Sequence, residues 1–135
     1  MENNFSHRLL NDAGLRVGND RLEIDVRLPW YRSLPLSVVD VFALSVDGHA
    51  VEKERMRFRI NDKSLALDDL KDQVEEFWFV LDPAVIEVRM PVTGADAPHE
   101  IELQLDLYPP YIPHLRWVTR AKRSLRPQRL SARDT

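Results

Sequence analysis

The sequence has 135 residues, of which 44% are hydrophobic and 30% are charged, and this composition predicts one globular domain with a hydrophobic core. No apolar run approaches the ~20 residues that cross a bilayer, and the N-terminus lacks a signal-peptide pattern. The absence of Cys excludes disulfides, a cysteine nucleophile and a Cys-based zinc site. We therefore expect a cytoplasmic protein that does not enter a membrane.

The net charge is -3, but basic residues are concentrated at one end of the chain. Residues 114–135 contain seven Lys or Arg and a single acid, Asp134, whereas the rest is acidic. Such a tail is typical of a nucleic-acid arm, of a docking segment for an acidic partner, or of a frayed, solvated terminus. An acidic body disfavours nucleic acid, because phosphate binding needs a basic face. We expect no nucleic-acid partner.

In chain order, apolar residues alternate with polar ones, as in strands that are buried on one face. The alternating segments are 22–28, 42–46, 56–60, 85–90 and 101–107, with a shorter apolar run at 77–82. In the second segment, Phe42 shares its phase with Leu44 and Val46. Asp47-Gly48 marks a hairpin directly after that segment.

Only residues 65–76 have helix-like spacing, and they form one short helix or a loop. Short strands separated by turns, with little helix, predict an all-β fold: an antiparallel two-sheet β-sandwich or jelly roll with at most one short helix. The expected organisation is an N-terminal segment (1–13), a β-sandwich domain (14–117) and a basic C-terminal tail (118–135). We expect the last ~20 residues to lie outside the sheets, because prolines at 109, 110 and 113 mark where the sheet ends.

Catalytic motifs are lacking in this sequence. There is no G-x-S-x-G elbow or glycine-rich phosphate loop, and the four His residues never stand at HxH or HxxxH spacing. A metal site assembled from distant residues remains open at this stage. The acids at 68–76 fit an exposed face better than a general acid–base pair. We therefore assign no catalytic residue and no metal ligand to this chain.

Two proline-rich stretches combine aromatic residues with arginine, namely LPWYRSLPLS (28–37) and LYPPYIPHLRW (107–117). Trp, Tyr and Arg dominate interface energetics, and prolines pre-order the loops that present them. The alternative is that Trp30 and Trp117 plug the two ends of the sandwich. The candidate partner-facing or substrate-facing residues are Trp30, Tyr31, Arg32, Tyr108, Tyr111 and Trp117.

LPWYRSLPLS, followed by VVDVFALSVDG, WFVLD (78–82) and PPYIP, resembles the β (small) subunits of bacterial C-glycoside deglycosidases. The resemblance spans roughly residues 14 to 117. It implies a β-sandwich subunit packed on a larger TIM-barrel α subunit, which holds a divalent metal, commonly Mn²⁺, and the catalytic His. It also implies a higher-order hetero-oligomer of αβ units.

The implied reaction is carbon–carbon lysis of a 3-oxo-C-glycoside, which releases the aglycone, often a flavonoid, and an unsaturated 3-keto anhydrosugar. A C–C bond offers no leaving oxygen to protonate, so two-carboxylate glycosidase chemistry fails. A ketone at C3 acidifies the C2 proton, and a metal Lewis acid stabilises the enolate before elimination.

A second reading of the sequence does not involve a catalytic partner. In that reading the chain is a stand-alone carbohydrate-binding or interaction β-sandwich, whose exposed Trp and Tyr stack on sugar rings. A soluble monomer that binds glycosides unaided would favour this reading.

Overall fold

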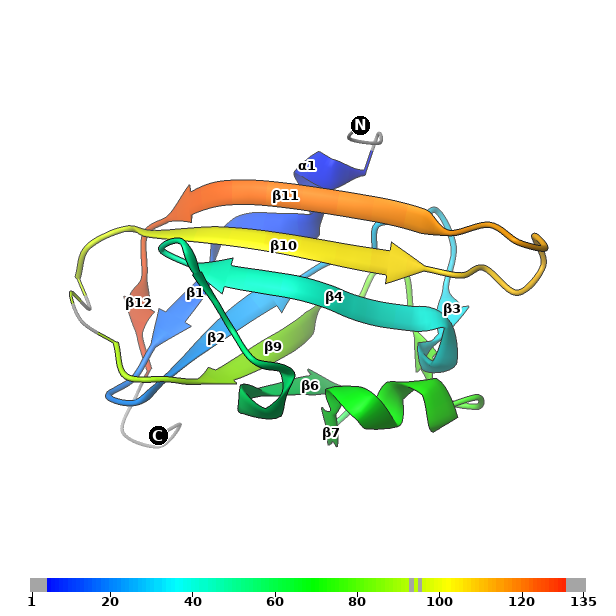
Figure 1. Cartoon of the computed structure of the whole chain (residues 1–135), viewed down its shortest axis with the longest axis horizontal. Helices are drawn as coiled ribbons and strands as arrows, with labels where there is room; N and C mark the ends of the chain where they lie inside the picture. The colour runs from blue at the N-terminus through cyan, green and yellow to red at the C-terminus, as the bar shows by residue number, and fades with distance from the viewer. Residues whose placement is uncertain (1–4, 93, 95, 131–135) are drawn as a thin grey trace.

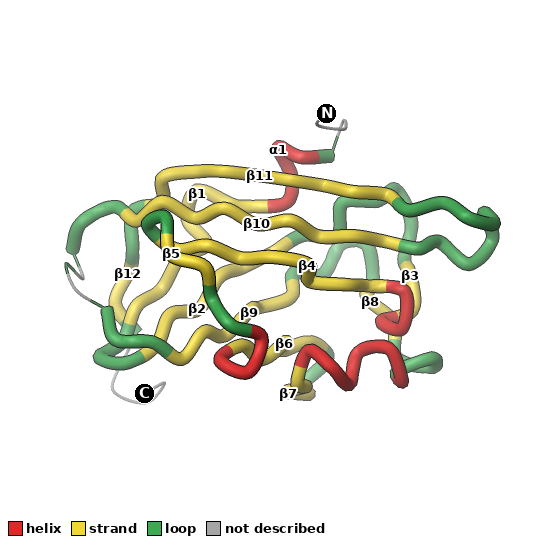
Figure 2. Tube along the Cα trace, in the orientation of Figure 1, coloured by secondary structure: helices red, strands yellow, loops and turns green. Residues whose placement is uncertain are grey.

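The computed structural model describes residues 5–92, 94 and 96–130. Two sheets face each other across a hydrophobic core, and a third, two-stranded sheet lies at one end of the molecule (Figure 1). The strands are β1 (Leu10–Val17), β2 (Arg21–Val26), β3 (Leu34–Pro35), β4 (Val39–Val46), β5 (His49–Ala50), β6 (Met56–Ile60), β7 (Lys63–Ala66), β8 (Phe77–Trp78), β9 (Ala84–Arg89), β10 (His99–Leu107), β11 (Trp117–Leu125) and β12 (Gln128–Arg129). The helical segments are α1 (Ser6–Leu9) and the 3-10 helices η1 (Leu36–Val38), η2 (Lys53–Arg55) and η3 (Leu67–Asp72) (Figure 2).

The all-β sandwich predicted from the sequence is confirmed. One sheet has the order β12-β1-β2-β9-β6-β7 and the other the order β11-β10-β4-β5, while β3 pairs with β8. Every pairing is antiparallel except that of β12 with β1. Among the described residues, no helix has the length and hydropathy to cross a membrane.

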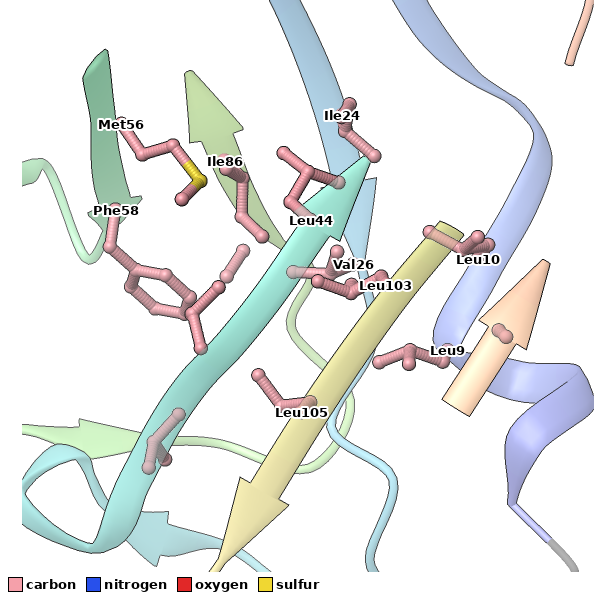
Figure 3. Packing of buried hydrophobic residues seen from close by; sticks show 14 of the residues in the cluster. Leu9, Leu10, Ile24, Val26, Leu44, Met56, Phe58, Ile86, Leu103 and Leu105 are labelled. Atoms are coloured by element: carbon pink, nitrogen blue, oxygen red, sulfur yellow. The ribbon is translucent and has the colours of Figure 1, made fainter. Parts of the chain in front are cut away.

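The core follows from the two-residue period of the strands. Ile24 and Val26 of β2 and Ile86 of β9 face Leu103 and Leu105 of β10 from across the sandwich (Figure 3). All five side chains are fully buried. Burial of aliphatic side chains on this scale is the main stabilising term of the fold, at about 25 cal/mol per Å².

The outer face of the six-stranded sheet carries a dense ionic network. Glu23 of β2 is only 3% exposed, because arginines from β1 and β6 lie over it. Arg59 donates two hydrogen bonds to its carboxylate, at 3.0 and 3.1 Å, and Arg16 donates one at 3.3 Å. Arg16 also forms a bidentate pair with Asp25. A buried carboxylate is tolerated here because its charge is paired on both sides.

The predicted phase of Phe42 is wrong. The pairing of β4 with β10 shifts register between Gln104↔Ala43 and Leu105↔Val41, so Phe42 is the extra residue of a β-bulge. The bulge turns Val41 into the core and leaves Phe42 47% exposed. The Asp47-Gly48 hairpin is confirmed, since both residues have positive φ and join β4 to β5.

The prediction that the last ~20 residues lie outside the sheets is wrong for the described part of that region. β11 pairs with β10 over nine residues, from Trp117↔Leu107 to Leu125↔His99, and β12 pairs with β1. β11 alternates inward Thr119, Ala121 and Leu125 with outward basic side chains, but the small and polar inward residues hide the apolar period. Residues 131–135 lie outside the described residues. The three-part division (1–13, 14–117, 118–135) remains a prediction. Strand β1 runs across its first boundary, and β11 runs across its second.

The helix-like segment 65–76 forms one short 3-10 helix, η3, preceded by β7. Leu70 is its buried side chain, so η3 lacks the continuous apolar stripe that would extend an α-helix over the core. The following apolar run, 77–82, is a strand only at Phe77–Trp78. Phe79 and Leu81 beyond it remain exposed.

Candidate partner-binding surface

The two proline-rich stretches meet at one end of the sandwich. The segment after β2 leads into β3, and the loop between β10 and β11 projects at the same end (Figure 1). Trp117 at the start of β11 donates its indole N–H to the carbonyl of Pro29, at 3.2 Å. The structure thus brings together five of the six predicted residues, which we call the aromatic cluster: Trp30, Tyr31, Arg32, Tyr111 and Trp117.

Trp30 is the buried centre of the aromatic cluster. It is 5% exposed, and its ring packs edge-on against Trp117 with centroids 5.1 Å apart. Phe5 contacts both indoles from the N-terminal side, at 6.3 Å from each. Trp30 and Trp117 therefore close the same end of the sandwich, so the alternative that they plug its two ends is wrong. The indole N–H of Trp30 is satisfied by the Tyr111 hydroxyl.

Tyr31, Arg32 and Tyr111 form the exposed side of the aromatic cluster. Tyr31 is 59% exposed and Tyr111 is 43% exposed. The Tyr111 hydroxyl donates to the Tyr31 hydroxyl at 3.5 Å, and the Arg32 guanidinium lies 4.9 Å from the centroid of the Tyr111 ring. Burial and the hydrogen bond to Tyr31 raise the pKa of the Tyr111 phenol. The exposed surface thus consists of two neutral phenol rings and one guanidinium cation, which suits it to stacking or to protein contact.

Tyr108, the sixth predicted residue, lies beside η3. It lines a groove of about 270 Å³ together with Leu67 and Asp68. Its backbone N–H donates to the carbonyl of Val38, at 3.0 Å. Tyr108 therefore borders a second part of the same end of the molecule.

An ion pair between a buried carboxylate and a half-exposed arginine joins the two ends of the loop between β10 and β11. Asp106 is fully buried, and Arg116 donates two hydrogen bonds to its carboxylate, at 2.9 and 2.6 Å. This hydrogen bonding raises the pKa of the Arg116 guanidinium. Arg116 also lies over the ring of Phe42, at 5.3 Å from its centroid. The loop that carries Tyr111 is consequently anchored at both ends, which limits the entropy lost on binding.

The tightest His–carboxylate pair lies at the other end of the sandwich. His99 is 5% exposed and its Nδ1 is 2.7 Å from Asp47, while its Nε2 is 3.0 Å from the carbonyl of Gly94. The two contacts tie the start of β10 to the turn after β4 and to the loop before β10. Burial opposes ionisation of Asp47, but hydrogen bonds from His99 and from the Glu100 backbone outweigh it and lower the pKa of Asp47. Across the described ranges, no three His, Asp or Glu side chains gather into a group that could hold a metal.

Sequence reasoning missed a group of exposed apolar residues near the aromatic cluster. Val74, Phe77, Phe79 and Leu81 are between 39% and 76% exposed. The available signal was their interleaving with acids between residues 68 and 82, since a run that is both acidic and apolar fits neither a core strand nor an ordinary polar loop.

Comparison with known proteins shows a single family. Residues 6–111 match the family described as C-glycoside deglycosidase beta subunit. The chain is 37% identical over 108 residues to a C-glycoside deglycosidase beta subunit of Arthrobacter globiformis, covering 80% of this chain and 82% of the relative. A 3'-dehydrocarminate deglycosidase beta subunit of Microbacterium sp is 36% identical over 109 residues, covering 81% and 82%. The family match includes Trp30, Tyr31, Arg32 and Tyr111 but stops short of Trp117.

Proposed function

The chain belongs to the C-glycoside deglycosidase beta subunit family, and we propose that it is the non-catalytic small subunit of a two-subunit enzyme that cleaves the C–C bond of 3-oxo-C-glycosides. In this proposal the reaction is a β-elimination that yields the aglycone and an unsaturated 3-keto anhydrosugar. The name of one relative, which acts on 3'-dehydrocarminate, supports a substrate oxidised at the 3' position.

The observation that carries the proposal is the exposed side of the aromatic cluster. Tyr31, Arg32 and Tyr111 stand exposed on a base that Trp30 and Trp117 hold rigid. Aromatic residues and arginine of this kind are typical interface anchors, and preorganised anchors lose little entropy on binding. The proposed partner is a larger, TIM-barrel α subunit in a hetero-oligomer of αβ units, and this surface packs near the mouth of its barrel.

The chemistry assigns different roles to the two subunits. In the proposal the larger subunit would supply the base and would hold a divalent cation, Mn²⁺, whose Lewis acidity would stabilise the enolate. The small subunit orients the aglycone and shields it from water. Its aromatic surface lies at the aglycone side, where planar phenolic rings stack on tyrosine. Flavonoids are aglycones of that shape.

The test is co-expression of the Tyr31→Ala/Arg32→Ala variant with the larger subunit. Both side chains are exposed, so the isolated variant keeps its fold, while complex recovery and cleavage of a 3-oxo-C-glycoside fall on the order of tenfold or more. Arg120→Ala/Lys122→Ala on the outer face of β11 is the matched control, which also removes two exposed side chains and should leave both readouts unchanged. Undiminished complex formation and activity in the first variant would refute the proposed surface.

The alternative function has its own support in the structure. Tyr31 and Tyr111 present exposed rings beside a guanidinium, which is also an arrangement that stacks on sugars. Isothermal titration of the isolated chain with C- and O-glycosides separates the two readings. Binding by the isolated chain, without any gain of activity when the larger subunit is supplied, would favour a stand-alone carbohydrate-binding domain.

A further inference from the structure

A second exposed apolar group lies next to the aromatic cluster, on the segment that runs from η3 through β8 to Asp82. We call residues 67–82 the acidic–apolar segment. Its exposed apolar side chains are Val74 (65%), Phe77 (39%), Phe79 (53%) and Leu81 (76%). Phe77 and Phe79 stack on each other with centroids 6.4 Å apart. Grouped, exposed aromatics of this kind usually mark an interaction site.

The acidic–apolar segment is held rigidly in this exposed position. Trp78 is fully buried, packs edge-on against Phe58 at 5.3 Å, and donates its indole N–H to the carbonyl of Asp82. On the other side, the backbone N–H of Val80 donates to the hydroxyl of Ser33, at 2.8 Å. The exposed rings are therefore fixed by the core beneath them, as a preorganised binding surface requires.

The charge of the acidic–apolar segment is strongly negative. It contains six acids and a single lysine, Lys71. Glu76 is paired with Lys63 at 2.6 Å and with Asn61 at 2.9 Å, and these hydrogen bonds lower the pKa of its carboxyl. The five remaining acids are exposed around the apolar side chains, and they are Asp68, Asp69, Asp72, Glu75 and Asp82.

We infer that the acidic–apolar segment docks onto the larger deglycosidase subunit, on an apolar face of that subunit bordered by Lys and Arg. The inference rests on the proposed function, which supplies the partner. The charge pattern favours this occupant over a symmetric pair of two copies of this chain, which would place acids against acids, and over an anionic lipid surface or a nucleic acid, which would be repelled. A basic protein surface neutralises the acids and covers the aromatics at once.

The acidic–apolar segment is continuous with the aromatic cluster. β3 and β8 pair at Leu34↔Trp78 and Pro35↔Phe77, which joins the chain that follows Arg32 to the chain that carries Phe79. Figure 2 shows both strands at the end of the molecule where the loop between β10 and β11 projects. Tyr108 of that loop and Asp68 of η3 line one groove. The aromatic cluster and the acidic–apolar segment therefore form one surface at this end of the molecule, which we call the docking face. The part contributed by the acidic–apolar segment is acidic.

Binding of the full-length chain to the purified larger subunit, measured by biolayer interferometry at several salt concentrations, tests the inference. Asp69→Asn/Asp72→Asn/Glu75→Gln should raise Kd on the order of tenfold at low salt and flatten its dependence on salt, because complementary rim charges act mainly through steering. Phe79→Ser/Leu81→Ser should raise Kd on the order of tenfold at every salt concentration.

The matched control is Asp20→Asn/Glu100→Gln/Glu102→Gln, which neutralises three exposed acids away from the docking face. It should keep the wild-type Kd and salt dependence, and urea unfolding of each isolated variant should match that of the wild type. Wild-type binding by both segment variants, with loss of binding in Tyr31→Ala/Arg32→Ala, would overturn the inference and leave the proposed function standing. Failure of the wild-type chain itself to bind the larger subunit would overturn both.

Discussion

At the scale of single residues, Trp30 and Tyr31 show how neighbours in sequence take opposite roles. Trp30 is 5% exposed and Tyr31 is 59% exposed, although their ring centroids lie only 4.9 Å apart. Trp30 stabilises the end of the sandwich through its contacts with Trp117 and Phe5. Tyr31 adds area to the exposed face above it. A Trp30 substitution would therefore reduce binding in two ways, by destabilising the fold and by disturbing the interface.

We predict that Trp30→Ala lowers the free energy of unfolding by about 3–5 kcal/mol, since it leaves a cavity among aromatic rings. Tyr31→Ala should change it by no more than about 0.5 kcal/mol, as for an exposed position. Urea denaturation of the two variants, followed by far-UV circular dichroism, measures the difference. Equal destabilisation by the two substitutions would contradict the roles assigned here.

The residue types of the candidate surface were predictable, but their division between core and surface was not. Trp, Tyr and Arg beside prolines indicate an interface from composition alone. Whether Trp30 faces inward depends on Trp117, which lies 87 positions further along the chain and reaches Trp30 only through the pairing of β11 with β10. Tyr108 was grouped with Tyr111 by sequence proximity, yet it borders η3.

At the scale of secondary-structure elements, the strands with regular alternation were predictable and those without it were not. β6 alternates apolar and charged residues, β10 alternates apolar and polar residues from Ile101 to Leu107, and both were located from that period. β11 was missed because Thr119 and Ala121 occupy its inward positions. The bulge at Phe42 was missed because register depends on the partner strand, which a local pattern does not contain.

The hairpin between β4 and β5 should respond to acid. The lowered pKa of Asp47 means that its ionised form favours the folded state, so its contribution is present above the ordinary value of 3.8 and is lost as the pH falls through the lowered one. We predict that Asp47→Asn lowers the unfolding free energy by about 0.5 kcal/mol at neutral pH, as for the loss of a hydrogen bond at a partly exposed site.

Urea denaturation between pH 7 and pH 3 measures this effect. The gap between wild type and Asp47→Asn should narrow as the pH drops below about 4, because the wild type then loses the same charge. Asp20→Asn, at an exposed position in the turn between β1 and β2, serves as the control. A gap that is independent of pH over this range would contradict the role of the Asp47 carboxylate.

At the scale of the whole molecule, the sandwich depends on a strand close to the end of the chain. β11 covers one side of β10 along its full length and places Leu125 in the core. Its Arg123 also donates to the carbonyl of Leu10, at 2.8 Å, which ties the four-stranded sheet to β1 of the other sheet. The basic character of this region belongs to the outer side of a strand, where Arg120 and Lys122 are exposed.

We predict that a chain ending at residue 116 does not fold cooperatively, because β10 loses one of its two partner strands and becomes an unpaired edge, and the core loses Leu125. Circular dichroism during urea denaturation should show no sigmoidal transition for the truncated chain. Arg120→Gln/Lys122→Gln in the full-length chain is the control and should retain the wild-type transition. Cooperative unfolding of the truncated chain would show that residues from 117 onward are dispensable for the fold.

The ionic network around Glu23 has a consequence for how this protein can evolve. Loss of Arg59 would remove two of the hydrogen bonds to a carboxylate that is 3% exposed and would leave only Arg16 and Arg21 to balance its charge, which makes it a costly single substitution. Substitution of both partners together by apolar residues of similar volume is far less costly. We therefore expect the effects of substitutions on this face of the sheet to be coupled rather than additive, whereas an exposed ring at the end of the molecule can be replaced without unbalancing a buried charge.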